Sequence, residues 1–558
     1  MAKEYPNVTL PQSGDMVEIS ELEKMFNSAK DAKKSRTSRW RRNEELYNGD
    51  LLRPFNLPKY KSRIEPNMIH SVLETIYSIL TDRNPKVDVM PKREDQTDSA
   101  RLAQEAIESV MEQSKANRSV ANMKRDGLLY GNGFIKLAYD SNDGIQFIVP
   151  DPYTVFIDPL ATSIENARCV IFATPQYVNK IKSDYGKTVP SEGKLNEFKS
   201  FVKESGYSND KVQSVDSIGP LDEDIDSDYG GGQALVKEAW YYDGDKLMLA
   251  SWCGKVLLQK VESPFEFIPV VTFQNYQSGH SIWGKGEPEI IESLAVGTAI
   301  SLSQGMDNLI LHGNPALLMS KSMSKIAGNR PTDKPGQIYW TSGPHERVDR
   351  IPAGNISSST LPLAESLMKM TDVVSGVHDI TQGRNPSGVT ASRAIQQLQE
   401  ASQQIIRTKE REVGQDAIVS LYKMTLEMLS KNYEEPIQIR RVNETGYEFD
   451  QINPYDIDYE MDFKYIPGSS MPESRANRFD QALDLFQMGL LEPEKFWRWT
   501  QKDISKDILE EILEQKRQQQ EAMQREQEIQ SSSTDEDEIM DSQLRMREMM
   551  GMNEQEPA

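Results

Sequence analysis

Cysteine and histidine are scarce in this chain, which has two cysteines and five histidines among its 558 residues. The cysteines lie far apart and outside any Cys-x-x-Cys pair, which indicates reduced, structural thiols in a cytosolic setting. The histidines are scattered and form no His-Glu-x-x-His motif, so a zinc site is not expected. The sequence points to a protein that uses no metal and no cofactor.

Long apolar runs are absent as well. No stretch approaches the roughly 20 apolar residues of a membrane-spanning helix. The first fifteen residues, MAKEYPNVTLPQSGD, lack the basic-then-apolar pattern of a secretory signal. We therefore expect no membrane partner. A chain of 558 residues with 37% hydrophobic and 27% charged residues suits a folded protein of several domains.

Acidic residues outnumber basic ones. The chain has 64 lysines and arginines and 86 aspartates and glutamates, which gives a net charge of −22. Such a balance argues against general affinity for nucleic acid, which rests on cations that neutralise phosphates. It still allows contact with nucleic acid through a surface that does not hold it.

The segment GHSIWGKGEPEI, residues 279–290, follows a predicted strand and has the spacing of a phosphate-binding loop. Gly286 stands where that motif needs a serine or threonine for Mg²⁺. Glu287 and Glu289 would repel a phosphate at the start of the following helix. We therefore favour a structural turn, and keep an NTPase with a degenerate phosphate loop as an alternative.

Other candidate sites are weaker. Residues 222–228, DEDIDSD, alternate carboxylates as a calcium loop does, but Ser227 and Gln233 break that template, which favours a solvated loop. Asp151 and Asp158 precede prolines beside a strand and are typical of turns. No Gly-x-Ser-x-Gly motif is present. The sequence predicts no catalytic site, and we expect no enzyme.

A basic run, KDAKKSRTSRWRR, covers residues 30–42 within a predicted helix. It could bind DNA, but in so acidic a chain we favour a solvated helix face or pairing with acidic neighbours. Residues 207–232 form a predicted acidic insertion, and residues 530–558 a disordered acidic tail.

Hydrophobic periodicity predicts a multidomain α+β chain. A long helix is expected over 391–432, with Gly414 as a plausible kink. The other predicted helices cover 20–49, 67–80, 97–129, 287–312, 361–376, 473–489 and 493–529, and predicted strands lie at 84–91, 134–140, 154–159, 234–244, 246–252, 267–274, 436–442 and 459–467.

The long helix is unusually rich in glutamine, with five between Gln396 and Gln404. Its apolar residues form one narrow stripe through Leu398 and Ile405. Such a helix is exposed on several sides or packs against copies of itself. An ordinary helix at a polar domain surface remains an alternative. Around a channel, neutral amides would neither clamp phosphates as cations do nor strongly repel them.

Taken in order, these elements resemble those of the portal proteins of tailed bacteriophages. The junction SGVTASRAIQQ between loop and long helix carries the resemblance, as do RWRRNEELYNGD, GLLYGNGFIKLAYD and VPDPYTVFIDP in the first third of the chain. The resemblance covers roughly residues 20–500.

The resemblance implies a portal-type α+β fold assembled as a ring, with wing, stem helices, clip, long kinked helix and helical crown. The implied parts are a wing (1–285 and 434–470), two stem helices (286–312 and 360–378), a clip (313–359), a tunnel loop (379–390), a long channel helix (391–433), a crown (471–529) and an acidic tail (530–558).

It also implies a role at one capsid vertex of the virion, reached from the host cytoplasm during assembly. A ring of about twelve copies would pass double-stranded DNA inward during packaging and outward during ejection. The implied partners are the terminase large subunit, head-tail adaptor or tail proteins, and capsid and scaffolding proteins. A packaging-motor ATPase with a degenerate phosphate loop at 279–286 is the first alternative, and a scaffold or adaptor ring without DNA in its channel is the second.

Two sets of residues follow from this resemblance. The DNA-channel set comprises Gln382, Arg384, Asn385, Ser387, Gln396 and Gln403. The clip set, which would contact the motor or adaptor, comprises Lys321, Lys325, Arg330, Lys334 and Arg347.

Overall fold

The computed structural model describes residues 13–82, 85–140, 143–187, 233–313, 360–377, 404–433, 436–443, 446–457 and 459–466, together with isolated positions between 317 and 350, residue 488 and residues 545–546. The chain divides into two compact units, Met1–Met471 and Pro472–Ala558. The helices and strands named below belong to the first unit. The predicted acidic insertion, the tunnel loop and the start of the long helix lie outside the described residues, and so do the two crown helices and the tail apart from those isolated positions.

The described N-terminal part opens with four helices: α1 Ser13–Asn48, α2 Met68–Thr81, α3 Thr97–Gln113 and α4 Ala116–Tyr130. The prediction of one helix over 97–129 was wrong. The chain breaks at Lys115, which has a positive φ of 54°. This break lets Val110 of α3 and Val120 of α4 enter the same core cluster from two directions.

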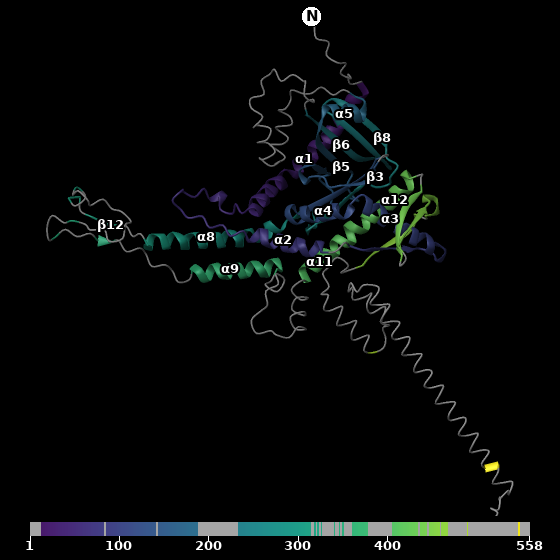
Figure 1. The fold of residues 1–558 in the computed structure, drawn as a ribbon. Helices are drawn as coiled ribbons and strands as arrows, with labels where there is room; N and C mark the ends of the chain where they lie inside the picture. Colours follow the sequence, from purple (N-terminus) through teal and green to yellow (C-terminus); the bar gives the residue numbers. More distant parts are fainter. Residues whose placement is uncertain are drawn as a thin grey trace, which may run out of the picture. The chain divides into compact units, whose positions relative to one another are not determined.

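Two antiparallel sheets form the centre of the unit (Figure 1). The larger has the order β4-β5-β6-β7-β8, and the smaller has the order β3-β2-β9. The bounds are β2 Asn132–Asp140, β3 Gly144–Ile148, β4 Val155–Ile157, β5 Cys169–Tyr177, β6 Gln233–Asp243, β7 Lys246–Cys253, β8 Val256–Glu262 and β9 Val270–Gln274, with the short helix α5 Val178–Tyr185 after β5.

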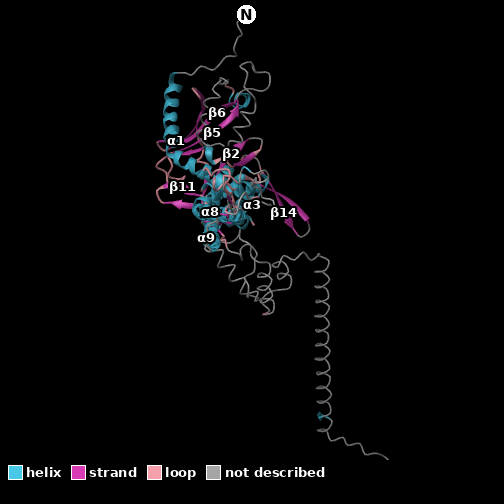
Figure 2. Ribbon diagram, turned by 90° about the vertical axis from the view of Figure 1, so that its left-hand side faces the viewer, coloured by secondary structure: helices cyan, strands magenta, loops and turns pink. Residues whose placement is uncertain are grey.

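The first half of α1 covers one face of the larger sheet, as the two lie side by side in Figure 2. Leu22 and Phe26 of α1 are buried in one cluster with Ile171 of β5 and Trp252 of β7. The two cysteines are buried and unpaired in the described structure, in agreement with the prediction of structural thiols.

The remaining elements lie after the sheets. The hairpin β10 Tyr276–Ser278 and β11 Ser281–Lys285 leads into α8 Glu287–Gly313, and α9 Thr360–Ser375 packs beside α8 (Figure 1). The other bounds are β12 Leu317–Leu318, β13 Asp349–Arg350, α11 Gln404–Glu412, a π-helical segment Val413–Ile418, α12 Val419–Asn432, β14 Ile437–Asn443, β15 Gly446–Ile452 and β16 Met461–Tyr465.

Strand β16 returns to pair with β1 (Val87–Pro91), with Val87 opposite Tyr465. This pairing joins the first and the last described strands of the unit, so residues far apart in sequence lie side by side. We call this unit, apart from α9 and the second half of α8, the body. Within the described residues, no helix is both long and apolar enough to cross a membrane.

Candidate assembly surface and channel-side helix

The segment with the spacing of a phosphate loop is a β-hairpin, since β10 and β11 pair through Tyr276 and Lys285. Its glycines serve close packing. A Cβ on Gly286 would lie 2.2 Å from the carbonyl oxygen of Leu129, and one on Gly284 would lie 2.6 Å from that of Gly131. The hairpin therefore has the structural role that we favoured, and its backbone does not form a phosphate cradle.

The basic run on α1 is used inside the protein. Lys33 is buried and donates to the backbone oxygens of Pro152, Tyr153 and Val155 at 2.7, 2.9 and 2.7 Å. Its burial lowers the pKa of the Lys33 ammonium well below the ordinary value, while the negative charge of Asp151 opposes that shift.

Further along α1, arginines pair with the first turns of α8. Arg36 lies 3.6 Å from Glu289, and Arg42 lies 2.7 Å from Glu292. Arg42 also donates to the backbone oxygen of Leu51. The run thus docks α1 on α8, which confirms the prediction that it pairs with acidic neighbours.

Asp151 and Asp158 are turn residues, as the sequence indicates. Asp151 accepts a hydrogen bond from the backbone N–H of Tyr153 at 3.0 Å. Asp158 pairs with Arg168 at 2.7 Å, and that hydrogen bond holds the pKa of the Asp158 carboxyl below its ordinary value. Across the described parts of the chain, no three histidine, cysteine or carboxylate side chains are grouped so that they could hold a metal ion.

The predicted contact residues are only partly described. Lys321 and Lys325 are exposed. The other three residues of the clip set and all six residues of the DNA-channel set lie outside the described part of the chain.

The described part of the long helix, which begins at Gln404, is anchored by a buried polar junction that the sequence did not reveal. Lys409 of α11 is 4% exposed and pairs directly with Glu287, the fully buried first residue of α8. Asn275 Nδ2 and the Tyr276 hydroxyl donate to the same carboxylate at 3.0 and 3.3 Å. This junction ties α11 to the start of α8 and to the β10–β11 hairpin.

The neighbouring residue Glu410 is buried too and accepts a hydrogen bond from the Tyr465 hydroxyl of β16. Lys124 of α4 donates to the backbone oxygen of Leu80 at 2.6 Å. Burial lowers the pKa of Lys124 to about 8, and the negative charge of Glu410 opposes this shift. From the sequence alone, Lys409 and Glu410 read as solvated residues of a polar helix.

Gly414, the predicted kink, lies in the π-helical segment that joins α11 to α12. A Cβ at this position would lie 2.2 Å from Cζ of Tyr465, so only glycine lets that ring pack against the helix. The prediction placed the irregularity correctly, and the structure gives its cause.

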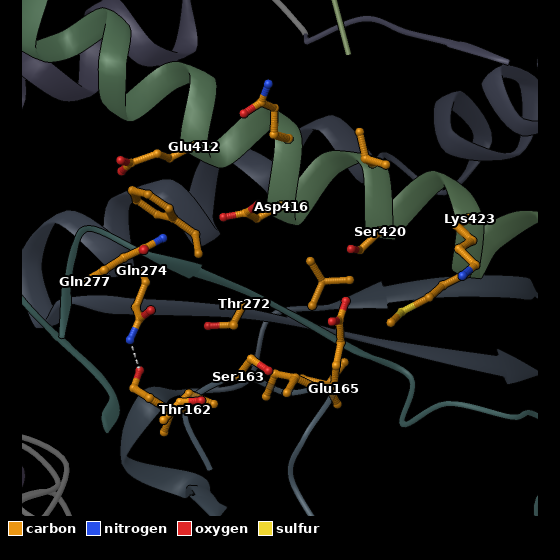
Figure 3. A pocket seen from close by; sticks show the side chains of 18 residues that line it. Thr162, Ser163, Glu165, Thr272, Gln274, Gln277, Glu412, Asp416, Ser420 and Lys423 are labelled. Carbon is orange, nitrogen blue, oxygen red and sulfur yellow. Dashed lines mark hydrogen bonds between the residues drawn. The ribbon is translucent and has the colours of Figure 1, made fainter. Parts of the chain in front are cut away.

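A cavity of about 560 Å³ lies beside this segment, between the helix, β9 and the loop 162–165 (Figure 3). Glu412, Asp416 and Lys423 line it from the helix, and Glu165 lines it from the loop. Burial first, and then a neighbouring carboxylate in each case, raises the pKa of Glu412 and of Asp416. The lining holds no histidine or cysteine, and the carboxylates repel one another.

Helices α8 and α9 show an unusual distribution of large and small side chains. In α8 after Ala299, and along α9, the buried residues are small: Ser301, Ser303, Ala364, Thr371 and Ser375. The hydroxyls of Ser301 and Thr371 donate to backbone oxygens four residues earlier in their own helices. The large apolar side chains point outward instead: Met306, Leu309, Ile310, Leu361, Leu363, Met370, Val373 and Val374 are all exposed.

The family whose model matches this sequence is described as the phage SU10 portal protein, and the match spans residues 141–552. That span is well over half of the chain. The chain belongs to the phage SU10 portal protein family. No curated protein matches it.

Membership confirms the family resemblance stated from the sequence and places the chain among portal proteins, which are structural rather than catalytic. The exposed apolar faces of α8 and α9 and the anchored helix α11 are described features of this portal protein.

Proposed function

We propose that this portal protein forms a closed ring at one capsid vertex, with about twelve copies around a channel. The channel passes double-stranded DNA during packaging and ejection. The ring docks the terminase motor first, and adaptor or tail proteins afterwards. The observation that carries the proposal is the outward apolar face of α8 and α9.

On α8, the apolar stripe is continuous along the helix. Ile291, Ala295 and Ala299 are buried against α1 and α2 in one core cluster. At the same helical spacing, the stripe continues through Leu302, Met306 and Leu309, where Leu309 is 59% exposed. The same face that binds the body therefore runs on and becomes exposed to solvent, from the half-buried Leu302 to Leu309.

On α9, Leu363, Leu367, Met370 and Val374 follow one another at steps of four, three and four. This is the spacing of a helix that packs along another helix. Leu367 already contacts Gly297 of α8, whereas Leu363 and Met370 are exposed. Burial of each large apolar side chain against a neighbouring copy would stabilise the assembly by about 1.5–3 kcal/mol.

A ring built in this way makes the paired helices its stem, in line with the division inferred from the family resemblance. Residues 313–359 then form the clip, and Lys321 and Lys325 with the remaining cations of that set meet the motor or adaptor. Residues 379–390 form the tunnel loop, and the glutamine-rich start of the long helix faces the channel. The buried Lys409–Glu287 pair fixes the next part of that helix, α11, to the body.

The proposal predicts closed rings in the purified protein. Native mass spectrometry, with negative-stain images of the same sample, should show one closed species near twelve copies with a central hole. Met370→Glu with Val374→Glu places charge in the α9 stripe and should abolish rings, while circular dichroism stays unchanged. Lys369→Glu, at an exposed position of the same helix but off the stripe, is the matched control for altered surface charge. Rings that survive the stripe variant would contradict the assigned interface.

The channel role has its own test. Deletion of residues 381–388 should leave rings intact, yet reduce packaged DNA in an assembly reaction with terminase and procapsids. Loss of the rings themselves would show that the segment holds subunits together and would count against a tunnel loop. Protection of short DNA in assembled rings, altered by Arg384→Ala or Gln403→Ala, distinguishes a portal from a ring without DNA.

A further inference from the structure

An arm, residues 53–63 (RPFNLPKYKSR), extends from the end of α1 and lies on the second half of α8. Its return is fixed to the helix. The backbone N–H of Ser62 donates to Asp307 Oδ1 at 2.8 Å, and the N–H of Ile64 donates to Ser303 Oγ at 3.0 Å. The Lys61 ammonium lies 3.2 Å from Asp307 Oδ2.

The root of the arm is held as firmly. The backbone N–H of Leu52 donates to Glu65 Oε1 at 2.6 Å, and Arg53 pairs with Glu45 at 3.0 Å. Pro54 and Pro58 restrict the backbone between the two anchors. Because the two anchors and the two prolines limit the conformations of the free arm, binding through it loses less conformational entropy than binding through an unanchored loop.

The tip of the arm presents aromatic and cationic groups to solvent. Tyr60 is 81% exposed and Phe55 is 51% exposed. Lys59 and Arg63 are exposed, and neither has an ion-pair partner among the described residues. The arm carries four cations and no acidic residue in a chain of net charge −22. Tyrosine and arginine are enriched at protein interfaces, so these groups suit a protein partner with apolar and acidic features.

The first turns of α9 have such features. Leu361 and Leu363 are exposed, and Glu365 beside them is an exposed carboxylate without an ion-pair partner in the described structure. They also lie at the level of the arm. Gly297 of α8 lies opposite Leu367 of α9, and α9 returns antiparallel to α8 (Figure 1). Ser303, which holds the arm, is six residues beyond Gly297, and Leu361 is six residues before Leu367.

Rotation about the axis of a ring leaves the height of each residue unchanged, so neighbouring subunits meet at similar levels. A ring also needs a heterologous contact, in which one surface of a subunit meets a different surface of the next. The arm is cationic and aromatic, whereas the start of α9 is apolar and acidic, and the two surfaces complement one another.

We infer that the arm binds the start of α9 on the neighbouring subunit, with Tyr60 against Leu361 and Leu363 and the cations of the arm facing Glu365. This inference rests on the proposed ring. It adds to the apolar stripes a specific contact at the first turns of α9, and this contact sets which neighbour is accepted and at what height.

Cross-linking between subunits tests the contact directly. Both native cysteines are buried, so introduced thiols face little background. Tyr60→Cys and Leu363→Cys chains are prepared separately, mixed under reducing conditions that allow assembly, and oxidised. A reducible dimer that contains one chain of each kind is expected. Tyr177→Cys, at an exposed tyrosine on β5, mixed with Leu363→Cys is the matched control and should give no such dimer.

The outcomes separate the two proposals. Rings in native mass spectrometry without the mixed dimer of Tyr60→Cys and Leu363→Cys chains would overturn the arm contact and leave the ring standing. A chain that forms no rings would contradict the ring and, with it, the arm contact. A reducible dimer from Tyr60→Cys alone would overturn the inference as well, because it would place two arms together.

Charge exchange gives an independent readout. Lys59→Glu with Arg63→Glu should raise the concentration needed for half assembly by about tenfold, since ion pairs at the rim of an interface contribute modestly and the reversed charges also repel Glu365. Addition of Glu365→Arg to the same chain should restore most of the loss. A loss that Glu365→Arg does not relieve would show that the arm does not meet α9.

Discussion

The two halves of α8 carry the same apolar stripe but differ in what covers it. In the first half, Ile291 and Ala295 are fully buried against α1 and α2. In the second half, Met306 and Leu309 face solvent, and the buried positions are serines bonded within the helix or to the arm. The body buries its apolar residues within one chain, whereas the paired helices expose apolar faces that the proposed ring would cover.

The body also contains buried charges, each held by fixed partners. Glu287 has a cation and two further donors, and Lys33 has three backbone oxygens. In the second half of α8 and in α9, buried hydroxyls such as those of Ser301 and Thr371 donate to backbone oxygens of their own helix. The body is therefore sensitive to loss of single polar partners, and the helix pair is sensitive to loss of apolar surface.

The largest expected effect is on the body. Lys409→Met leaves Glu287 buried without its cation and should lower the free energy of unfolding by about 3–5 kcal/mol. Urea unfolding followed by tryptophan fluorescence measures this. Lys246→Met, which removes an exposed pair with Glu262, is the control and should cost less than about 1 kcal/mol. Addition of Glu287→Leu to Lys409→Met should recover much of the loss, and a further loss instead would contradict this account.

The second prediction tests the two halves of α8 with matched truncations. Ile291→Ala should lower the free energy of unfolding of the isolated chain by about 2–5 kcal/mol, because it leaves a cavity in the core. Leu309→Ala should change that quantity by less than about 0.5 kcal/mol, because the side chain is exposed. In ring assembly the order should reverse, with Leu309→Ala the more damaging of the two among chains that fold. Equal effects in both assays would remove the distinction between the halves.

The last prediction concerns pH. Burial, and then the negative charge of Asp151, raises the pKa of Asp126 to about 7 from its ordinary 3.8. Between these values the folded chain keeps a proton that the unfolded chain has released. Asp126 therefore makes the free energy of unfolding fall as pH rises from about 4 to about 7. Asp126→Asn should remove this part of the slope, as urea unfolding across that range would show, and parallel slopes in the two proteins would contradict the assignment.

Much of the described secondary structure could be predicted from periodicity and end signals. Pro288 near the start of α8 and Gly49 after α1 mark boundaries that the structure places within a few residues of those predicted. The break at Lys115 was missed because neither of its neighbours is a glycine or proline. The need for it comes from the core, which α3 and α4 must enter from two directions.

The features of the candidate site were also predictable from the sequence only in part. The family followed from the order of elements and the loop-to-helix junction, and the family match confirms it. The outward stripes could have been recognised in the sequence as heptad-like spacing, but not their exposure, since exposure depends on where the body ends. Lys409 and Glu410 gave no signal at all, because their partners, Glu287 and Tyr465, are far away in the chain.

The sequence by itself determined the local structure and the family: helix and strand periods, turns at Gly and Pro, the acidic balance and the loss of a phosphate motif at Gly286. Tertiary structure decided which charges are buried, why Gly414 must be glycine, and which half of the α8 stripe is covered. Local patterns follow from the chemistry of neighbouring residues, whereas burial depends on contacts between residues that only the fold brings together.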